Sequence, residues 1–394
     1  MPTDSAFFLT KIECPVCKTV NEFETVRVGA YVERGRDTDF CPLEIQWRYP
    51  RYEAYNPLAF FTATCSNCHY SREYNNAYRD WKKDQNFKMY RLKVVKERHL
   101  EKLAQADSVV RALGEKVDLT SHPNESAVLK LHLAIFDELL AEHPTALDLG
   151  RFYLRIGWAF RDMEKGENPG VKLIRGLMSE IESRLTSLQG PSESFGREID
   201  VYQRHIKAHF EADNIPGSTK SQMTAYQDRF HQAISGLASS WKVTLASLGS
   251  LGELSAGYQR EILGSDSGSS ELSFGGAASF SGYLSELRKS WDGVVTCELE
   301  ALKRAVHYYQ EAFASGRDIA TGYQQLQASY LIAELSRRVG DHDSARQYFN
   351  STIKHGQEFI YQNRQDRSRT ALARKILELA MDQGRQNMEA LKKA

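Results

Sequence analysis

The sequence contains no long apolar run and no excess of charge of either sign. No segment approaches the roughly 18 consecutive apolar residues of a membrane-spanning helix, and 51 Lys and Arg residues balance 51 Asp and Glu residues in a chain of 394. The first residues have no basic start and only a short apolar run, unlike a secretory signal. These absences predict a soluble cytoplasmic protein with no membrane partner, and they argue against a uniformly polyanion-binding surface.

Motifs of the common enzyme classes are missing as well. The sequence has no phosphate loop, dinucleotide fingerprint, nucleophile elbow or protein-kinase signature. His205 and His209 stand one helical turn apart, but no His-Glu-x-x-His pattern accompanies them, so we expect a surface or packed histidine pair. We therefore nominate no catalytic residue and no organic cofactor. The sequence leaves enzymatic activity open and favours a protein that is not an enzyme.

Cysteine is scarce and unevenly placed. Five of the six cysteines fall within residues 14–68, and the sixth is Cys297, which we expect to be a small buried hydrophobe. A secreted disulfide framework would spread paired cysteines along a short chain. Here four of them form two Cys-x-x-Cys hooks, made by Cys14 with Cys17 and by Cys65 with Cys68. In a reducing compartment this pattern indicates a metal site.

The two hooks predict one structural zinc ion. Four thiolates complete a tetrahedral Zn²⁺ shell with bonds of about 2.3 Å, which leaves no open position for water or substrate. Two alternatives remain at the level of the sequence. One is an iron–sulfur cluster, and the other is a thioredoxin-like redox pair, which would need only one hook within a βαβ unit.

Cys41 is a fifth cysteine where a closed zinc shell needs four. It has three interpretations: a buried thiol packed beside the metal site, a metal ligand (with Cys41 or His69 replacing a hook cysteine), or a reactive thiol. Asp37 and Asp39 precede it and would raise the pKa of its thiol, which opposes thiolate chemistry. We therefore prefer the buried thiol.

An aromatic-basic run lies between the hooks. Trp47, Arg48, Tyr49 and Arg51 could stack on the bases and hold the phosphates of a nucleic acid, and basic and aromatic residues continue through 72–102. The simpler interpretation is that the aromatic side chains pack the N-terminal domain onto the first helices while the charges are solvated. We prefer this packing interpretation.

Hydrophobic periodicity predicts an α+β fold that is predominantly α. The first 80 residues hold short β-prone runs, among them residues 23–32 with strand-like alternation, whereas later apolar residues recur at spacings of three and four. Predicted helices cover residues 126–140, 146–163, 171–188, 195–210, 221–248, a single long stripe over 284–313, 321–339, 343–361 and 367–391. The Gly- and Ser-rich residues 249–282 are expected to form a flexible connector. The long stripes favour core packing, with oligomer formation through them as the alternative.

One pair of predicted helices has the spacing of a tetratricopeptide hairpin. Ala333 and Ala345 would let the two helices approach closely, Gly340 would make the turn, and Phe349 would fill the seam. A second, weaker match to this pattern is the pair Ala159 and Gly166, which has the same spacing as Ala333 and Gly340. Because stable arrays need about three such units, a helical hairpin without repeat ancestry is the alternative.

Four motifs together carry a resemblance to a known family. "CPVC", "RDTDFCP", "NPLAFFTATCSNCHY" and "YLIAELSRRVGD" resemble the bacterial family of domain of unknown function 2225. The resemblance covers residues 10–170 and 290–365, and the stretch between them looks like an insertion. It implies a zinc module followed by tetratricopeptide-like helices, and it places Cys41 within the motif of the family, which favours a site role for this cysteine. It implies no activity.

These observations predict a chain of four parts. We expect a zinc-ribbon-like module over residues 1–80, a helical region with a first tetratricopeptide-like hairpin over 81–170, long helices with a connector over 171–290, and tetratricopeptide-like helices over 291–394. The predicted function is a zinc-stabilised, non-enzymatic adaptor that binds a protein partner through its helices. The alternatives are a nucleic-acid-binding protein and a redox or metal-dependent enzyme involving Cys41.

Overall fold

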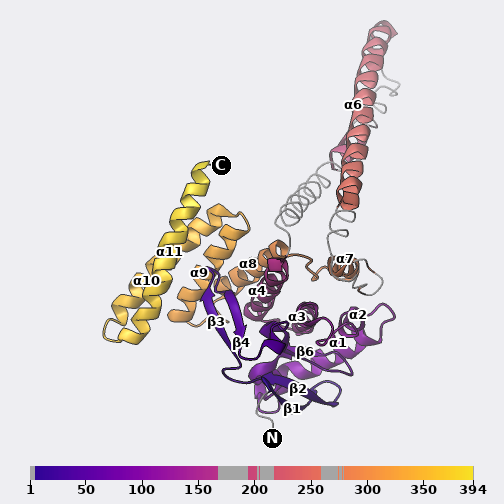
Figure 1. Ribbon diagram of the computed structural model, residues 1–394. Coiled ribbons are helices and arrows are strands. Elements are labelled where there is room, and N and C mark those ends of the chain that lie inside the picture. Colours follow the sequence, from indigo (N-terminus) through magenta and orange to yellow (C-terminus); the bar gives the residue numbers. More distant parts are fainter. Residues whose placement is uncertain are drawn as a thin grey trace. The chain divides into compact units, whose positions relative to one another are not determined.

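The computed structural model describes residues 5–166, 194–201, 204, 217–258, 274, 277 and 279–393. The chain forms two compact units, one made of residues 1–165 with 272–394 and the other of residues 166–271. Short antiparallel sheets occupy the N-terminal region and helices make up most of the rest (Figure 1). The predicted class, α+β and predominantly α, is confirmed. Among the described residues, no helix has the length and apolar character needed to cross a membrane.

Three two-stranded antiparallel hairpins build the N-terminal region. They pair β1 (Phe7–Glu13) with β2 (Val20–Val26), β3 (Tyr31–Arg36) with β4 (Pro42–Trp47), and β5 (Thr62–Thr64) with β6 (Ser71–Glu73). The connection of each hairpin carries one of the cysteine motifs. The first hook lies between β1 and β2, Cys41 lies between β3 and β4, and the second hook lies between β5 and β6. The fold thus places all three motifs on tight turns.

The prediction of one strand over residues 23–32 is wrong, because a turn divides this run between β2 and β3. The backbone N–H of Ala30 donates to the Arg27 carbonyl over 3.0 Å, and Gly29 has a φ of 76°. Glycine adopts this left-handed conformation without steric cost. Val28 is fully exposed at the tip of this turn. It fitted the alternating apolar pattern of a strand although it is not part of one, which is why the prediction failed.

Among the described residues, the first unit contains nine α-helices. They are α1 (Leu92–Ala104), α2 (Val109–Gly114), α3 (Pro123–Leu139), α4 (Ala146–Met163), α7 (Phe280–Ser290), α8 (Glu298–Ser315), α9 (Tyr323–Arg338), α10 (His342–Gln362) and α11 (Arg367–Lys393), with the short turns η1 (Pro50–Tyr52), η2 (Pro57–Phe60), η3 (Tyr74–Tyr78), η4 (Phe87–Arg91) and η5 (Glu164–Gly166). In α3, 13 of 17 residues are buried because α1, α2, α4, η2, β5 and β6 all pack on it. Helix α3 therefore joins the strands to the helical body.

A single helix over residues 284–313 is not formed, and this prediction is wrong. The stripe is divided between α7 and α8 by an extended segment, in which Val294 and Val295 are buried. The Val295 N–H donates to His132 Nε2 over 3.1 Å, and the Tyr153 hydroxyl donates to the Gly293 carbonyl over 2.8 Å. Tertiary partners thus replace the helical hydrogen bonds here. Cys297, half-buried, is the residue that precedes α8.

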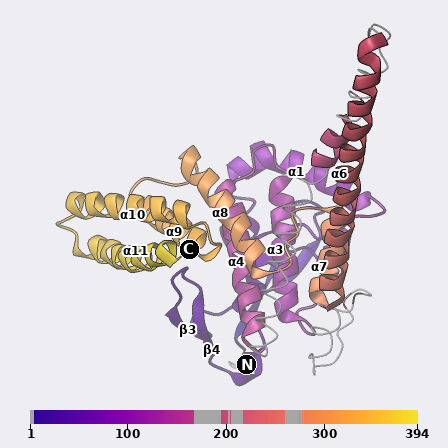
Figure 2. The same cartoon turned by 90° about the horizontal axis from the view of Figure 1, so that it is seen from above.

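The predicted hairpin of α9 and α10 is present. Gly340 has a φ of 84° at the turn, and the Asp341 side chain caps α10 by accepting from the Ser344 N–H over 3.0 Å. Ala333 and Ala345 are fully buried at the crossing, and Phe349 is almost so. Helix α11 lies against α10 and completes this bundle (Figure 2). In the weaker match at Ala159 and Gly166, the second helix of the hairpin would follow Gly166. That segment lies outside the described residues.

The second unit contains α6 (Gly217–Tyr258), which at 42 residues is longer than the predicted helix. It includes residues 249–258, so the prediction of a flexible connector is wrong for this part, and residues 280–282 belong to α7. The apolar spacing of three and four outweighs the glycines in 249–258. The predicted helix 171–188, most of 195–210 and most of the remaining connector lie outside the described residues. Phe195 packs edge-to-face on Trp241 with ring centroids 4.8 Å apart.

Candidate metal centre

The first hook is a tight turn closed by two backbone hydrogen bonds. The Cys14 N–H donates to the Thr19 carbonyl over 2.8 Å, and the Lys18 N–H donates back to the Cys14 carbonyl over 3.1 Å. Lys18 adopts a positive φ of 67°, which costs a non-glycine residue of order 1 kcal/mol and persists only where its surroundings impose it. The turn directs Cys14 and Cys17 to the same side.

The second hook repeats this arrangement. The Cys65 N–H donates to the Tyr70 carbonyl and the His69 N–H donates to the Cys65 carbonyl, both over 2.9 Å. His69, the residue after the hook, has a φ of 63°. Both Cys-x-x-Cys hooks therefore have the same pair of backbone hydrogen bonds, and in both the residue that follows the second cysteine has a positive φ. This is expected for two halves of one site.

The two hooks bring four sulfurs together. All four Sγ atoms lie within 4.8 Å of one another, with 3.7 Å between Cys14 and Cys68 and 3.5 Å between Cys17 and Cys65. Bonds of about 2.3 Å to a tetrahedral ion place ligand sulfurs about 3.8 Å apart, whereas a disulfide needs about 2.05 Å. The four cysteines are free thiols, and their arrangement could hold one metal ion.

Hydrogen bonds favour negative charge at this cluster. The pKa of Cys65 lies well below its usual range because Cys14 and then Cys68 donate to its sulfur. The Asn21 amide also donates to Cys65 Sγ over 3.5 Å, and its oxygen accepts from the N–H of Ser66 over 2.8 Å. Hydrogen bonding within the cluster thus favours the thiolate form of Cys65, whereas the same contacts raise the pKa of Cys14 to about 12 and raise that of Cys68. Metal binding requires this deprotonated form.

A buried ion pair anchors the second hook to the helices. His99 of α1 donates from Nε2 to the Cys68 carbonyl over 2.8 Å and from Nδ1 to Asp137 of α3 over 2.6 Å. Burial alone would lower the pKa of His99, but the Asp137 carboxylate outweighs it and raises that pKa. Asp137 also accepts from the Ser71 N–H over 2.6 Å. These hydrogen bonds therefore connect the four-cysteine cluster to the core around α3.

Aromatic side chains after the second hook pack rather than face solvent. Tyr74, Tyr78 and Trp81 are buried, whereas Tyr90 is exposed. Burial, and then the Cys14 sulfur, raise the pKa of Tyr78 well above its usual range. The Trp81 indole N–H donates to the Glu13 carbonyl over 2.8 Å. For these three rings the packing interpretation is confirmed.

The aromatic-basic run does not present its tryptophan to solvent. Trp47 is 4% exposed, packs against Phe7 with ring centroids 5.8 Å apart, and donates its indole N–H to the Tyr55 carbonyl over 2.9 Å. Trp47 therefore agrees with the preferred packing interpretation, and it cannot stack on a base as the nucleic-acid alternative requires. Arg48 is exposed and lies 5.8 Å from the ring centroid of half-buried Tyr49. Arg51 lies 4.9 Å from that of Tyr52.

The turn that carries Cys41 forms a charged clasp with the helical body. We call this set the acidic clasp, and it comprises Asp37, Thr38, Asp39, Arg161, Glu298, Glu334 and Arg338. Asp39 is fully buried. It accepts from Arg161 of α4 over 2.7 Å and from the Trp158 indole of the same helix over 3.2 Å. The acidic carboxylates raise the pKa of Arg161 well above its usual range despite burial.

The clasp also reaches α9. Asp37 pairs with Arg338 over 2.8 Å, the Thr38 hydroxyl donates to Glu334 over 2.5 Å, and the Tyr330 hydroxyl donates to the Thr38 carbonyl over 2.8 Å. Two motifs almost 300 residues apart in sequence, "RDTDFCP" and "YLIAELSRRVGD", are thus direct partners in space. Sequence reasoning missed this contact. The only available signal was that one motif carries two acids and the other two arginines.

Cys41 and His69 are not members of the four-sulfur cluster, which among the described residues contains only the hook cysteines. Cys41 is buried, and its thiol donates to the Pro42 carbonyl over 3.6 Å. Burial raises the pKa of Cys41 to about 12, although Arg161 opposes this shift. His69 is half-buried beside Gly114 of α2. The position of Cys41 agrees with a buried thiol whose partners belong to the clasp turn rather than to a hook.

We expect Cys41 to resist alkylation in the native protein. At pH 8 a pKa of about 12 leaves so little thiolate that iodoacetamide should react roughly a thousandfold more slowly than with an ordinary thiol of pKa about 8.5. Mass spectrometry of the Cys41 peptide, with and without denaturant, measures both rates. Equal rates in the two conditions would contradict this assignment.

Comparison with known proteins identifies one match. A family model described as "Uncharacterized protein conserved in bacteria (DUF2225)" matches residues 7–190 and 287–374. These ranges include both hooks, the acidic clasp and the α9–α10 hairpin. No curated protein and no solved structure matches the chain.

Proposed function

The chain belongs to this uncharacterised bacterial family, and we propose that it is a non-enzymatic scaffold. In this proposal one structural Zn²⁺ holds the β hairpins, the acidic clasp ties them to the helical body, and the C-terminal helices bind a protein partner. The observation that carries the proposal is the set of exposed apolar side chains on α10 and α11.

Zinc is the ion that best suits the four sulfurs. Zn²⁺ accepts four thiolates in tetrahedral geometry, and sulfur separations of 3.5 and 3.7 Å suit a single central ion. An iron–sulfur cluster distributes its cysteines over several irons, which requires a wider cage. A thioredoxin-like pair requires a βαβ setting, whereas both hooks lie on hairpin turns. A closed shell of four protein ligands supports a structural role.

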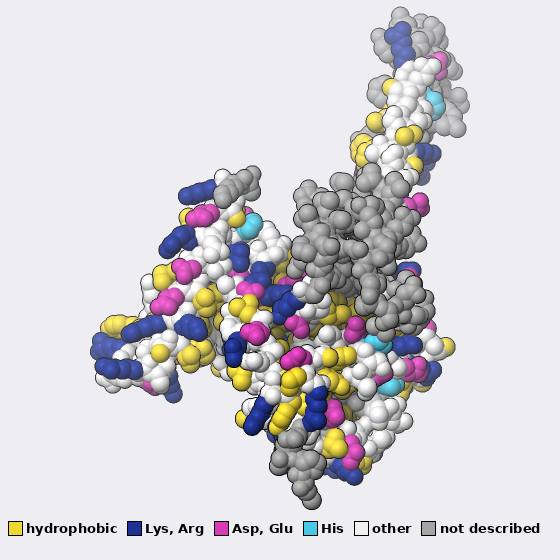
Figure 3. Space-filling model, in the orientation of Figure 1, with side chains coloured by type: hydrophobic (Ala, Val, Ile, Leu, Met, Phe, Trp, Pro, Cys, Tyr) yellow, Lys and Arg dark blue, Asp and Glu magenta, His cyan; other side chains and the backbone are white. Residues whose placement is uncertain are grey.

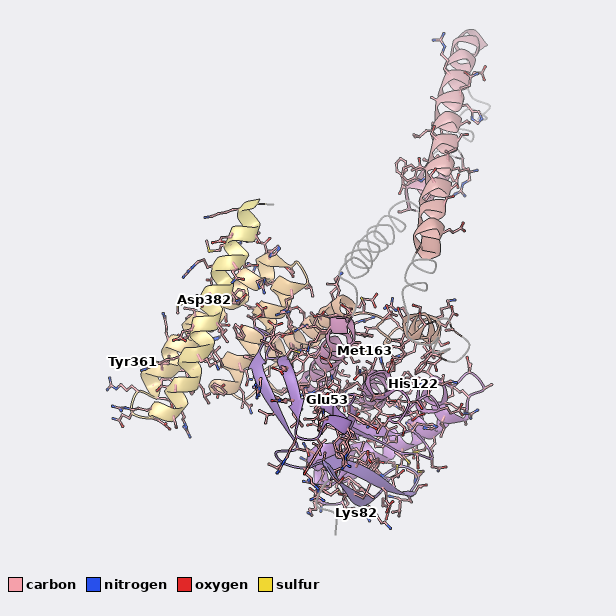
Figure 4. The ribbon with its side chains drawn as sticks, in the orientation of Figure 1. Glu53, Lys82, His122, Met163, Tyr361 and Asp382 are labelled. Carbon is pink, nitrogen blue, oxygen red and sulfur yellow. The ribbon has the colours of Figure 1, made fainter. Side chains whose placement is uncertain are left out.

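The C-terminal helices offer the partner surface. Tyr361 of α10 is 72% exposed, and on α11 the exposed fractions are 54% for Leu372, 48% for Met381 and 52% for Met388. Figure 4 labels Tyr361 on α10 and Asp382 on α11. Figure 3 shows apolar side chains among charged ones in this part of the molecule. Methionine side chains are flexible and polarizable, which suits them to a protein interface.

These helices also have a core of their own. Leu326, Tyr330 and Ala333 of α9 pack with Phe349 of α10 and Ile376 of α11 in a cluster separate from the main core. The exposed side chains therefore stand on a packed platform rather than on an isolated helix. A preformed helical face of this kind lowers the cost of ordering on binding.

The test replaces two exposed methionines on one face of α11. Met381→Lys with Met388→Lys places charges seven residues apart, and Ala371→Lys with Gln386→Lys is the matched control at exposed positions of the same helix. Proteins captured by the full-length chain should be lost with the first variant and kept with the second, and direct binding to the purified captured protein should agree. Equal capture by both variants would overturn the proposed surface.

A further inference from the structure

A cavity of about 340 Å³ lies beside Cys41. Its walls come from β2, β3 and β4, from η2 and η3 and from α4, and they include Ile45, Leu58, Phe61 and Trp158. Small-molecule sites commonly enclose about 300–1,000 Å³ and are mainly apolar with a few placed polar groups. The cavity has the size and the walls of such a site, and it is separate from the four-sulfur cluster and from α10 and α11.

In the part of the chain that the structure describes, three charged side chains line this cavity, and two of them already have partners of opposite charge. Glu33 pairs with Arg36 over 3.0 Å, and Asp162 pairs with Lys165 over 2.7 Å. The third is Arg155 of α4, which donates to the Arg151 carbonyl over 3.0 Å. Within the described part of the chain, Arg155 forms no ion pair with a carboxylate.

The surroundings of Arg155 make this lack of a counter-ion costly. Its guanidinium lies 4.1 Å from the ring centroid of Phe61 and 5.8 Å from that of Trp158. Arg155 is half-buried; burial, and then the charge of Arg151, lower its pKa, and the carboxylates of Glu73 and Asp148 only partly oppose this shift. The neighbouring Arg151, in contrast, pairs with Glu73 and Asp148. A desolvated guanidinium held by ring faces is best stabilised by an anion that accepts two parallel hydrogen bonds.

We propose that this cavity binds a small carboxylic acid with an apolar body. The carboxylate would pair with Arg155, and the apolar body would lie against Leu58, Ile45 and the aromatic walls. Cys41 would form part of the wall as a neutral thiol rather than as a nucleophile. The proposal does not depend on the partner surface of α10 and α11, because no residue of those helices lines the cavity.

Calorimetry on the metal-loaded full-length chain tests the proposal with straight-chain carboxylates from acetate to octanoate. Affinity should rise with chain length until the cavity is filled, and each acid should bind about tenfold or more tightly than its primary amide, which lacks the charge. Inorganic phosphate, which has no apolar body, should bind more weakly than hexanoate. Absence of binding across the series, equal affinity for acids and amides, or tighter binding of phosphate would overturn the proposal.

Variants assign the preference to Arg155. Arg155→Met keeps the length and apolar contacts of the side chain and should abolish the preference for acid over amide. The exposed Arg346→Met on α10 should leave it unchanged. Retention of the preference in Arg155→Met would contradict the assigned site, and if that variant fails to fold, the comparison of acids with amides on the unmodified chain still decides the outcome.

Discussion

Cys68→Ser is expected to release the metal ion and to unfold the N-terminal hairpins. Cys68 is 1% exposed, and among the described residues the group that could hold a metal ion contains only the four hook cysteines, so no fifth ligand is in place to substitute for its sulfur. Structural zinc sites contribute an apparent binding free energy of about 10–16 kcal/mol in small domains. The Cys68→Ser variant keeps three thiolates and places a hydroxyl in the buried fourth position. Its free energy of unfolding should therefore be lower than that of the unmodified protein by more than about 4 kcal/mol.

Cys41→Ser and Cys297→Ser are the matched controls. Both exchange a sulfur for an oxygen at sites outside the four-sulfur cluster, so both should retain one ion per chain. Elemental analysis and thermal unfolding, with and without a chelator, measure the two properties together. A full metal content in Cys68→Ser, or loss of metal from Cys41→Ser, would contradict the assigned ligand set.

Asp39→Asn is expected to destabilise the protein by about 3 kcal/mol without loss of metal. The substitution conserves size but removes a fully buried negative charge that accepts from Arg161 over 2.7 Å. Arg161 is then left partly desolvated, with Asp37 and Glu298 as its remaining ion-pair partners among the described residues. Removal of one member of a buried pair is costly because the other charge stays buried.

Asp343→Asn is the control for this prediction. Asp343 pairs with Arg346 on the surface of α10, and exposed pairs contribute about 0–1 kcal/mol. Urea unfolding monitored by circular dichroism gives both free energies. Equal stability losses in the two variants would show that the acidic clasp is not a buried electrostatic contact, and metal loss from Asp39→Asn would show that the clasp and the metal site are not independent.

Local features were predictable from the sequence because their causes are local. The Cys-x-x-Cys spacing identified the hooks, since the cysteines of each hook are brought together by a single turn. The spacing of apolar residues predicted α4 at 146–163, the range that the helix occupies. Gly340 at the α9–α10 turn was identifiable for the same reason, because a tight turn between helices favours a residue that tolerates positive φ.

Other features depend on partners far apart in the sequence. The break between α7 and α8 is stabilised by His132 and Tyr153, which lie more than 130 residues away, and no local pattern reveals such partners. The acidic clasp joins residues separated by 122 and 300 positions. Burial of Trp47 and Cys41 was the preferred interpretation of the sequence, but their neighbours were not predictable: Trp47 packs on Phe7 and donates to the Tyr55 carbonyl, and the Cys41 thiol donates to the Pro42 carbonyl.

X-ray absorption at the zinc edge of the purified full-length protein tests the central claim most directly. One closed structural site predicts a single shell of four sulfurs at about 2.3 Å, unchanged in Cys41→Ser. A nitrogen or oxygen atom in this shell, a sulfur shell altered by Cys41→Ser, or scattering from a second metal would contradict the account.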